Sequence, residues 1–314
     1  MLKKILFYCA AVALLILLVL HFISLPRTLD ASLIPQHKAD LQNGENLFWA
    51  GGCASCHAQK EARAKARLML GGGVELETPF GVFIAPNISP DRQAGIGSWN
   101  TAEFINAMVN GVSPDSTHYF PAFPYPNYRS MPYTDLIDLK AFLDTLPPIS
   151  SATADHRLHF PFNIRAAVGL WKLLYLNTGT FSARPGVEAS VERGRYLVNG
   201  PGHCAACHTP RDLFGGEIKN RLLAGARSLD SASSTKAPKS NRIPNITPHA
   251  EDGIGKWSEN DIAYALESGF DPDFDSFGGS MVEVQENMAH LPASDRLAIA
   301  RYLKSIPALA STRD

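Results

Sequence analysis

The sequence has no excess of charge of either sign. Its 314 residues hold 29 Lys and Arg against 30 Asp and Glu, which leaves a net charge of −1 at pH 7. Proteins that bind nucleic acid usually carry a basic patch or stripe. We therefore expect no nucleic-acid partner. An apolar content of 45% with 19% charged residues is typical of a globular protein.

Long alternating patterns of apolar and polar residues are also absent. Apolar residues instead recur at helical spacing, as in the segments 101–110 and 259–268. The sequence therefore predicts an all-α fold. The chain is long for a single hydrophobic core, which favours more than one domain.

Only one long apolar run is present, and it lies at the N-terminus. Lys3 and Lys4 precede an uncharged stretch over residues 5–25. At about 1.5 Å per residue, this stretch reaches the roughly 30 Å of a bilayer core. The basic flank predicts a cytoplasmic N-terminus, with the remainder outside. We expect residues 1–27 to anchor the protein in the inner (cytoplasmic) membrane, facing the periplasm. The alternative is a cleaved signal peptide.

An internal repeat divides the rest of the chain. Residues 86–111 read PNISPDRQAGIGSWNTAEFINAMVNG, and residues 244–269 read PNITPHAEDGIGKWSENDIAYALESG. This repeat predicts two similar domains, over residues 35–150 and 188–310, with a linker over residues 151–187.

Each copy should contain two helices with recognisable starts. Glu103 and Asp261 lie three residues after polar residues that can close a capping box. The last helix of each copy should also begin at a hydroxyl side chain. The expected caps are Asn100 and Thr134 in the first copy, and Ser258 and Ser294 in the second.

Two segments outside this pattern have their own predictions. The apolar stretch 166–176, around Trp171, is expected to form a short helix packed on one domain; contact with the membrane or a partner is the alternative. Residues 227–242 are rich in Ser, Lys and Ala, which predicts a solvent loop.

Four of the five cysteines occur in two C-x-x-C-H motifs, and the fifth, Cys9, lies in the apolar run. On one helical turn, cysteines three apart face the same side and can form thioethers with the two vinyl groups of a haem. The following histidine is then directed at the iron. The motifs predict two covalently bound haem c groups, at Cys53, Cys56 and His57, and at Cys204, Cys207 and His208.

Two other uses of paired cysteines compete with haem attachment. A structural zinc shared by both pairs would not explain a histidine directly after each pair. A redox-active dithiol would be expected near a βαβ pattern, which this sequence lacks.

The sixth iron ligand separates electron transfer from chemistry at the iron. Met131 precedes the last helix of the first copy, where a loop can reach the distal face. In the second copy, the distance from the helix-ending glycine favours Met288, whereas the preceding glycines of GGSM favour Met281, which we prefer. The predicted iron ligands are His57 with Met131, and His208 with Met281. Such His/Met ligation leaves no open position on the iron.

The proximal imidazole should be held by a second group. A backbone carbonyl near Pro86 or Pro244 is the candidate acceptor for the ring N–H of each histidine.

Several longer segments carry a resemblance to a known family. They include LGGGVELETPFGVFIAPNISPD, HYFPAFPYPNYRSM, HFPFNIRAAVGLWKLL and GGSMVEV. Over most of residues 40–308, the chain resembles the class I cytochrome c subunits of membrane-bound periplasmic dehydrogenases for alcohols, aldehydes, gluconate and sugars. The resemblance implies two tandem class I cytochrome c domains, Met131 as a sixth ligand, and Met281 rather than Met288. Those subunits carry three haem domains, whereas this chain carries two.

These observations together favour an electron-transfer protein and not an enzyme. We expect a membrane-anchored dihaem cytochrome c that accepts electrons from a periplasmic dehydrogenase. The acceptor would be a quinone, another cytochrome or a terminal oxidase. One alternative is a dihaem redox enzyme of the peroxidase or thiosulfate dehydrogenase type. Another is a respiratory-complex subunit that mainly docks through residues 5–25 and 166–176.

Overall fold

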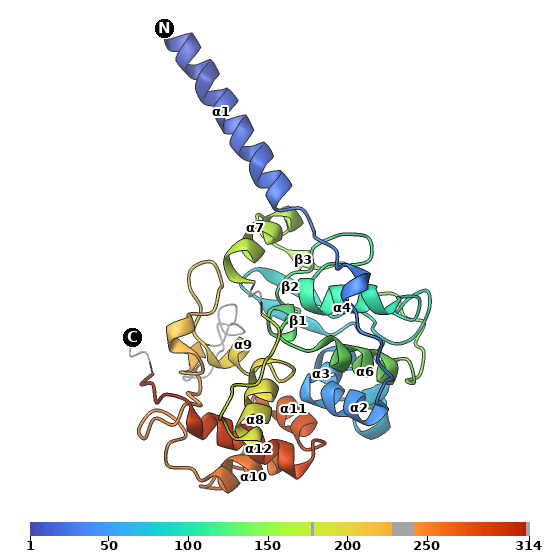
Figure 1. Ribbon diagram of the computed structural model, residues 1–314, viewed down its shortest axis with the longest axis vertical. Coiled ribbons are helices and arrows are strands. Elements are labelled where there is room, and N and C mark those ends of the chain that lie inside the picture. The colour runs from blue at the N-terminus through green and yellow to red at the C-terminus, as the bar shows by residue number, and fades with distance from the viewer. Residues whose placement is uncertain (177–178, 228–241, 312–314) are drawn as a thin grey trace.

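The computed structural model describes residues 1–176, 179–227 and 242–311. Helix α1 (Leu2–Ile23) projects away from a body that contains all the other elements (Figure 1). None of the residues of α1 is buried, and the helix is long and apolar enough to cross a membrane. The apolar run predicted as an anchor or signal peptide is therefore a single exposed helix.

The same order of elements occurs in both copies of the repeat: a helix, a short helix over the C-x-x-C-H motif, paired strands, a helix, a short helix and a last helix. The first copy contains α2 (Leu41–Ala50), α3 (Cys53–His57), β1 (Glu75–Thr78), β2 (Gly81–Ile84), α4 (Thr101–Asn110), α5 (Tyr125–Tyr128) and α6 (Tyr133–Leu143). The second contains α8 (Ala189–Asn199), α9 (Ala205–His208), β4 (Ala226–Arg227), β5 (Arg242–Ile243), α10 (Glu259–Ser268), α11 (Met281–Met288) and α12 (Ala293–Ser305). Short 3₁₀ helices lie at η1 (Ala31–Leu33), η2 (Ala64–Leu68) and η3 (Lys219–Arg221).

Both predicted capping boxes are confirmed. The Asn100 side chain accepts from the Glu103 N–H at 2.9 Å, and the Glu103 carboxylate accepts from the Asn100 N–H at 2.8 Å. Ser258 and Asp261 make the same pair of bonds at 3.1 and 2.7 Å. These bonds satisfy amide groups that the first helical turn leaves without partners.

The predicted caps of the last helices are wrong. Helix α6 begins at Tyr133 and α12 at Ala293, with Pro132 and Pro292 in the cap positions. Thr134 and Ser294 lie inside the first turn instead. A proline has no N–H and a fixed φ, so it ends the preceding loop and lets the helix begin at the next residue.

The all-α prediction is only approximate, because two small sheets are present among the described residues. Strands β1 and β2 form an antiparallel hairpin, and β3 (Arg157–Leu158) adds to β2. Strands β4 and β5 pair in the second copy. Gly81 adopts φ 118°, and a Cβ there would lie 2.4 Å from the Arg157 carbonyl oxygen. Strands of two to four residues are too short to show a clear alternating pattern.

The first and last helices of each copy cross at a glycine. A Cβ on Gly44 of α2 would lie 2.2 Å from the Asp138 carbonyl oxygen of α6. A Cβ on Gly194 of α8 would lie 1.9 Å from the Ala298 carbonyl oxygen of α12. Only a residue without a side chain permits this approach. Each C-x-x-C-H motif follows the first of these two helices.

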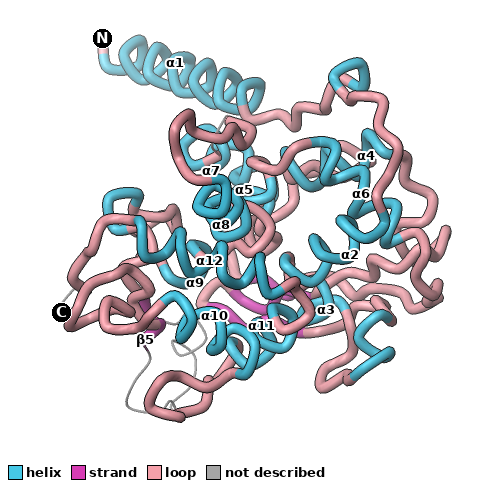
Figure 2. Tube along the Cα trace, turned by 60° about the horizontal axis from the view of Figure 1, so that its bottom comes forward, coloured by secondary structure: helices cyan, strands magenta, loops and turns pink. Residues whose placement is uncertain are grey.

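The two copies pack on each other around one connected apolar core. It includes Phe48 and Leu136 from the first copy, and Leu197 and Ile299 from the second. Figure 2 shows the helices of both copies gathered in one body below α1.

The predicted short helix of the linker is present as α7 (Arg165–Tyr175). It lies at the foot of α1 and contacts both copies, not one (Figure 1). The solvent loop predicted at 227–242 lies, apart from its two end residues, outside the described residues.

Candidate functional site

The first C-x-x-C-H motif forms one isolated helical turn. Gly52, with φ 59°, turns the chain from α2 into α3. Both cysteines of the motif, Cys53 and Cys56, are half-buried, as is His57. The turn therefore presents two thiols and an imidazole on neighbouring positions.

The second motif is built in the same way with one difference. His203, with φ 36°, replaces the glycine as the turning residue before Cys204. Helix α9 then runs through Cys207 to His208, and Cys207 is exposed. Histidine is among the non-glycine residues that are enriched in this left-handed region.

Each motif histidine is held by the carbonyl that the sequence predicted. The Nδ1–H of His57 donates to the Pro86 carbonyl at 2.7 Å, and that of His208 donates to the Pro244 carbonyl at 2.8 Å. The bond fixes the tautomer and leaves Nε2 as the free ligating atom. Burial lowers the pKa of both histidines, which favours the neutral ring that a metal ligand requires.

The carbonyl of Pro86 is itself fixed by the chain that follows α6. Asn87 Nδ2 donates to the Ile149 carbonyl at 2.6 Å, and Asn87 Oδ1 accepts from the Ser89 N–H at 2.9 Å. Ser89 Oγ in turn accepts from the Ile149 N–H at 2.9 Å. The asparagine after the proline therefore ties the loop that carries the Pro86 carbonyl to the end of the copy. We call this set of bonds the asparagine lock.

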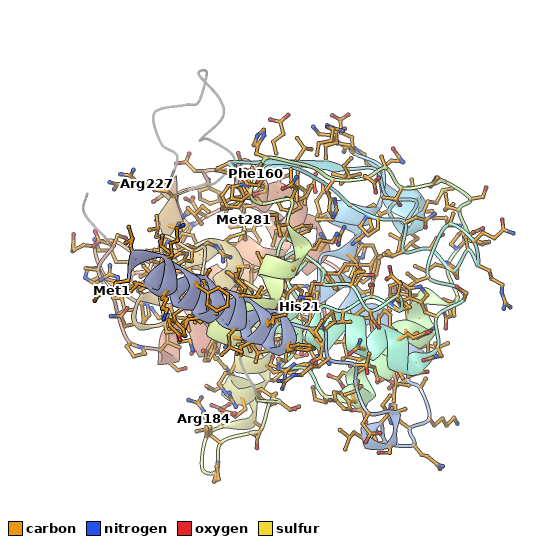
Figure 3. The ribbon with its side chains drawn as sticks, turned by 90° about the horizontal axis from the view of Figure 1, so that it is seen from above. Met1, His21, Phe160, Arg184, Arg227 and Met281 are labelled. Atoms are coloured by element: carbon orange, nitrogen blue, oxygen red, sulfur yellow. The ribbon has the colours of Figure 1, made fainter. Side chains whose placement is uncertain are left out.

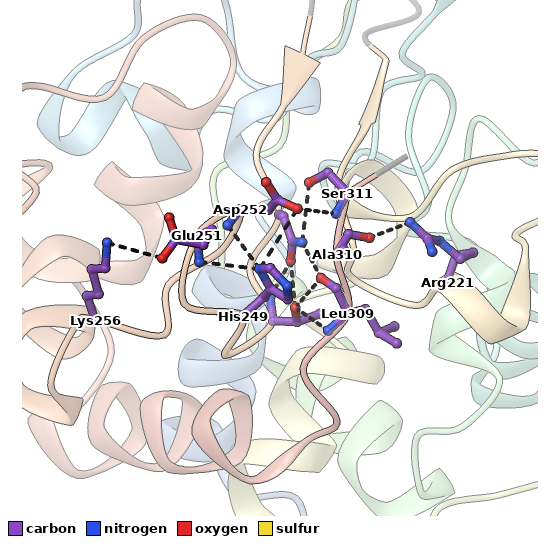
Figure 4. A network of polar contacts seen from close by, with 10 residues as sticks. Arg221, His249, Glu251, Asp252, Lys256, Leu309, Ala310 and Ser311 are labelled. Atoms are coloured by element: carbon purple, nitrogen blue, oxygen red, sulfur yellow. Dashed lines mark hydrogen bonds and ion pairs between the residues drawn. The ribbon is translucent and has the colours of Figure 1, made fainter. Parts of the chain in front are cut away.

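The second copy repeats this lock bond for bond. Asn245 Nδ2 donates to the Leu309 carbonyl at 2.6 Å, and the Leu309 N–H donates to Thr247 Oγ1 at 3.1 Å. Farther along, the Ser311 N–H donates to Asp252 at 3.0 Å, and Arg221 binds the Ala310 carbonyl (Figure 4). Neither lock was foreseen, although the repeated P-N-I-[ST]-P segments carried the signal.

The distal segments of the two copies differ. Met131 is 1% exposed, and its N–H donates to the Tyr128 carbonyl. In the second copy, the Leu291 N–H donates to the Met288 carbonyl, and a proline follows, as Pro132 follows Met131. Leu291 therefore occupies the position of Met131.

By the same register, Met288 matches Tyr128. Its side chain is 3% exposed and lies in the common core. Met281 is the first residue of α11 and is half-buried. The second copy thus has no methionine at the position that Met131 takes in the first.

The distal segment of the first copy lies against the attachment motif of the second. The rings of Tyr128 and His203 meet edge to face, with centroids 5.7 Å apart. Both side chains bond to the Gly51 carbonyl, two residues before Cys53, at 3.3 Å. His203, which directly precedes Cys204 of the second motif, is therefore bonded to the backbone just before the first motif.

The distal segment of the second copy makes the reciprocal contact. Asn287 of α11 donates to Ser55 Oγ, inside the first motif, at 2.7 Å and accepts from Arg67 at 2.9 Å. His290 stacks on Trp49 with ring centroids 3.8 Å apart. None of these pairs was foreseen, because the partners lie more than 200 residues apart in the sequence.

The two motifs also lie within electrostatic reach of each other. Burial raises the pKa of the Cys56 thiol to about 11, and the charges of Glu283 and Cys207 act in the same direction. Cys56 belongs to the first motif and Cys207 to the second. The contacts between the copies therefore bring the two attachment sites together.

The side chains present fit a haem c at each motif. Each site supplies two thiols on one helical turn and a neutral imidazole whose Nε2 is free. The competing zinc site lacks support, since the described residues contain no group of three or more His, Cys, Asp or Glu placed to hold a metal. The strands of the described residues pair antiparallel, unlike the βαβ arrangement expected around a redox dithiol.

Comparison with known proteins agrees with this geometry. A family model for cytochrome c matches residues 41–147. The chain is 48% identical over 280 residues to a diheme cytochrome c-type protein of Cereibacter sphaeroides, which covers 89% of this chain and 90% of that protein.

Two longer relatives are similar over most of this chain. It is 33% identical over 271 residues to the gluconate 2-dehydrogenase cytochrome c subunit of Pantoea cypripedii, covering 85% of this chain and 60% of that protein. It is also 33% identical over 279 residues to the cytochrome c subunit of the alcohol dehydrogenase (quinone) of Gluconobacter oxydans, covering 87% and 56%. This chain therefore spans little more than half the length of these two relatives. It belongs to the cytochrome c family, as a c-type cytochrome with two covalently bound haem c groups.

Proposed function

We propose that this protein is a membrane-anchored electron carrier that accepts electrons from a periplasmic dehydrogenase and passes them to the respiratory chain. The observation that carries the proposal is the pair of equivalent proximal sites, with His–carbonyl distances of 2.7 and 2.8 Å, in one packed body. The relatives named as cytochrome c subunits of gluconate and alcohol dehydrogenases support a dehydrogenase as donor. The acceptor is a quinone, another cytochrome or a terminal oxidase.

Each haem c supplies a one-electron iron centre when bound, and the residues of the chain hold and saturate it. For the first site we propose His57 and Met131 as the axial ligands. The complete burial of Met131 places its thioether among apolar side chains, and a thioether ligand raises the potential relative to a second imidazole.

For the second site we propose His208 and Met281. Met281 is half-buried and follows Gly278 and Gly279, where an added Cβ would meet nothing within 4 Å. The free space around these glycines supports a segment that can move Met281 to the iron. Met288, by contrast, takes the position of Tyr128 in the first copy, which we do not propose as a ligand. With both irons saturated, the protein carries electrons and leaves no site for an exogenous substrate.

The membrane and domain assignments belong to the same proposal. Residues 1–27 anchor the protein in the inner membrane, and the body faces the periplasm. Residues 35–150 and 188–310 form two class I cytochrome c domains, joined by residues 151–187. The matching element order and the glycine crossings at Gly44 and Gly194 support this division.

Carbon monoxide binding to the reduced holoprotein tests the carrier function. A saturated iron has no position for the gas, so neither haem should bind it on mixing. Fast and stoichiometric binding at one haem would instead support the dihaem redox enzyme.

A further inference from the structure

We propose that the body makes a second contact with the lipid bilayer, beside α1, through an exposed apolar rim. The rim consists of Phe160, Phe162, Ile164, Leu173, Leu174 and Phe214. This inference rests on the membrane anchor of the proposed function and adds a second, separate contact. Exposed apolar side chains that gather on one surface mark an interaction site, whereas single exposed ones do not.

The rim draws its side chains from three segments. Phe160, in the segment before α7, is 80% exposed; Leu174, on α7, is 69% exposed; and Phe214, in a turn of the second copy, is 70% exposed. The Trp171 indole N–H donates to the Phe214 carbonyl at 3.0 Å, which joins the turn to α7. The Tyr175 hydroxyl reinforces this junction by donating to Asp212 at 2.8 Å.

The rim lies where α1 leaves the body. Ser24, directly after α1, is 7% exposed, and its carbonyl accepts from His118 Nε2 at 2.7 Å. Gly169 of α7 comes so close that a Cβ there would lie 2.1 Å from the same oxygen. Figure 1 shows α7 at the foot of α1, and Figure 3, seen from above, labels His21 of α1 and Phe160.

A buried lysine fixes α7, and with it the rim, to the base of α1. Lys172 Nζ donates to the Asn110 and Gly111 carbonyls, both at 2.7 Å, and to His118 Nδ1 at 3.0 Å. His118 therefore accepts from α7 through one ring nitrogen and donates to Ser24 through the other. This chain of bonds sets the height of the rim relative to the anchor.

The arrangement fits a bilayer as the occupant. The face of α7 that carries Val168, Gly169 and Lys172 is buried on the body, while Leu173 and Leu174 face outward. A helix with one apolar face, in the plane beside a spanning helix, is the form that interfacial membrane helices take. Aromatic residues with a polar tip, such as Trp171 and Tyr175, suit the same boundary. Because α1 places the membrane surface next to the rim, lipid reaches it without a further partner.

Spin-label depth measurements on the full-length holoprotein in nanodiscs test the inference. In a Cys9→Ala background, Phe160→Cys and Leu174→Cys carry a nitroxide on the rim, and Leu14→Cys carries one on α1. Tyr264→Cys is the matched control, since Tyr264 is a 53% exposed apolar residue on α10, at the opposite end of the body (Figure 1). With the haems reduced, power saturation compares the accessibility of each label to oxygen and to a water-soluble nickel chelate.

We expect labels at positions 14, 160 and 174 to favour oxygen over nickel several-fold more than the label at position 264. If the label at 14 lies in lipid while those at 160 and 174 match the control, the rim does not touch the bilayer and is left for a protein partner. An aqueous label at 14 would overturn the anchor itself. Lipid exposure at 160 and 174 would support the rim in either case.

Discussion

The two haem sites are alike on the proximal side of the imidazole and different on the distal side. Proximally, the histidine–carbonyl bonds and the asparagine locks agree to within a few tenths of an ångström. Distally, α5 has 4 residues and α11 has 8, and Leu291 stands where the first copy has Met131. The proximal side depends on side chains and carbonyls that the repeat preserves in both copies. The distal side depends on single side chains, so it is where the two potentials should diverge.

Replacing the distal methionine of the first copy should have the largest effect. Met131→His exchanges a thioether for an imidazole and should lower one midpoint potential by on the order of 0.1 V or more, part of the roughly 0.8 V that axial ligands span. Potentiometric titration measures this shift. Met69→His is the control, because Met69 is 46% exposed and should leave both potentials unchanged. An unchanged potential in Met131→His would remove Met131 as a ligand.

Replacing the glycine at each helix crossing tests whether the helices of the two copies are packed equally tightly. Gly44→Ala and Gly194→Ala each place a Cβ within 2.2 Å of a backbone oxygen, and each should lower the free energy of unfolding by about 1–3 kcal/mol. Denaturant unfolding of the holoprotein measures both. Gly278→Ala serves as the control, because a Cβ there meets nothing within 4 Å. A neutral result at one crossing would show that its helices can separate without cost.

The asparagine locks should matter less for stability than the crossings, and should act on the proximal ring. Asn87→Ala and Asn245→Ala each remove the amide donor to the Ile149 or Leu309 carbonyl and leave it only a hydroxyl donor, which should lower the free energy of unfolding by about 1–2 kcal/mol. Each should also shift the potential of its own haem only. Asn245→Asp, which keeps the Oδ1 acceptor, is the matched variant for the second site. Equal shifts at both haems would contradict two separate locks.

The stacking of His290 on Trp49, between the two copies, should contribute least to the free energy of unfolding. A double-mutant cycle with Trp49→Leu and His290→Ala should give a coupling energy of about 0.5–1.5 kcal/mol, as aromatic pairs usually do. The cycle is read from denaturant unfolding. Zero coupling would mean that α11 is held against the first motif by Asn287 and Arg67 alone.

Local patterns in the sequence predicted the parts of the molecule that neighbouring residues determine. The C-x-x-C-H turns, the capping boxes at Asn100 and Ser258, and the carbonyls of Pro86 and Pro244 all depend on short segments that the repeat shows twice. The strands escaped notice because four residues or fewer carry little periodicity. Thr134 and Ser294 were wrongly predicted as helix caps, because Pro132 and Pro292 already set the start of each helix.

The contacts between the copies could not be predicted in this way. His203 meets Gly51, and Asn287 meets Ser55, only after both copies have folded. The residue of the second copy that matches Met131 could not be predicted for a related reason. Counting residues from Gly269 pairs Met288 with Met131, whereas the longer α11 shifts the matching position to Leu291.

The axial ligands of both irons are the most direct test of the carrier assignment. The chain has six methionines, and labelling their methyl groups lets NMR of the reduced holoprotein count those bound to iron, because the haem ring current shifts a ligated methyl strongly. We predict shifted methyl signals from Met131 and Met281, lost one at a time in Met131→His and Met281→His and both retained in Met288→Leu. Retention of both signals in Met281→His, or a native protein with fewer than two, would contradict a carrier with both irons saturated by these residues.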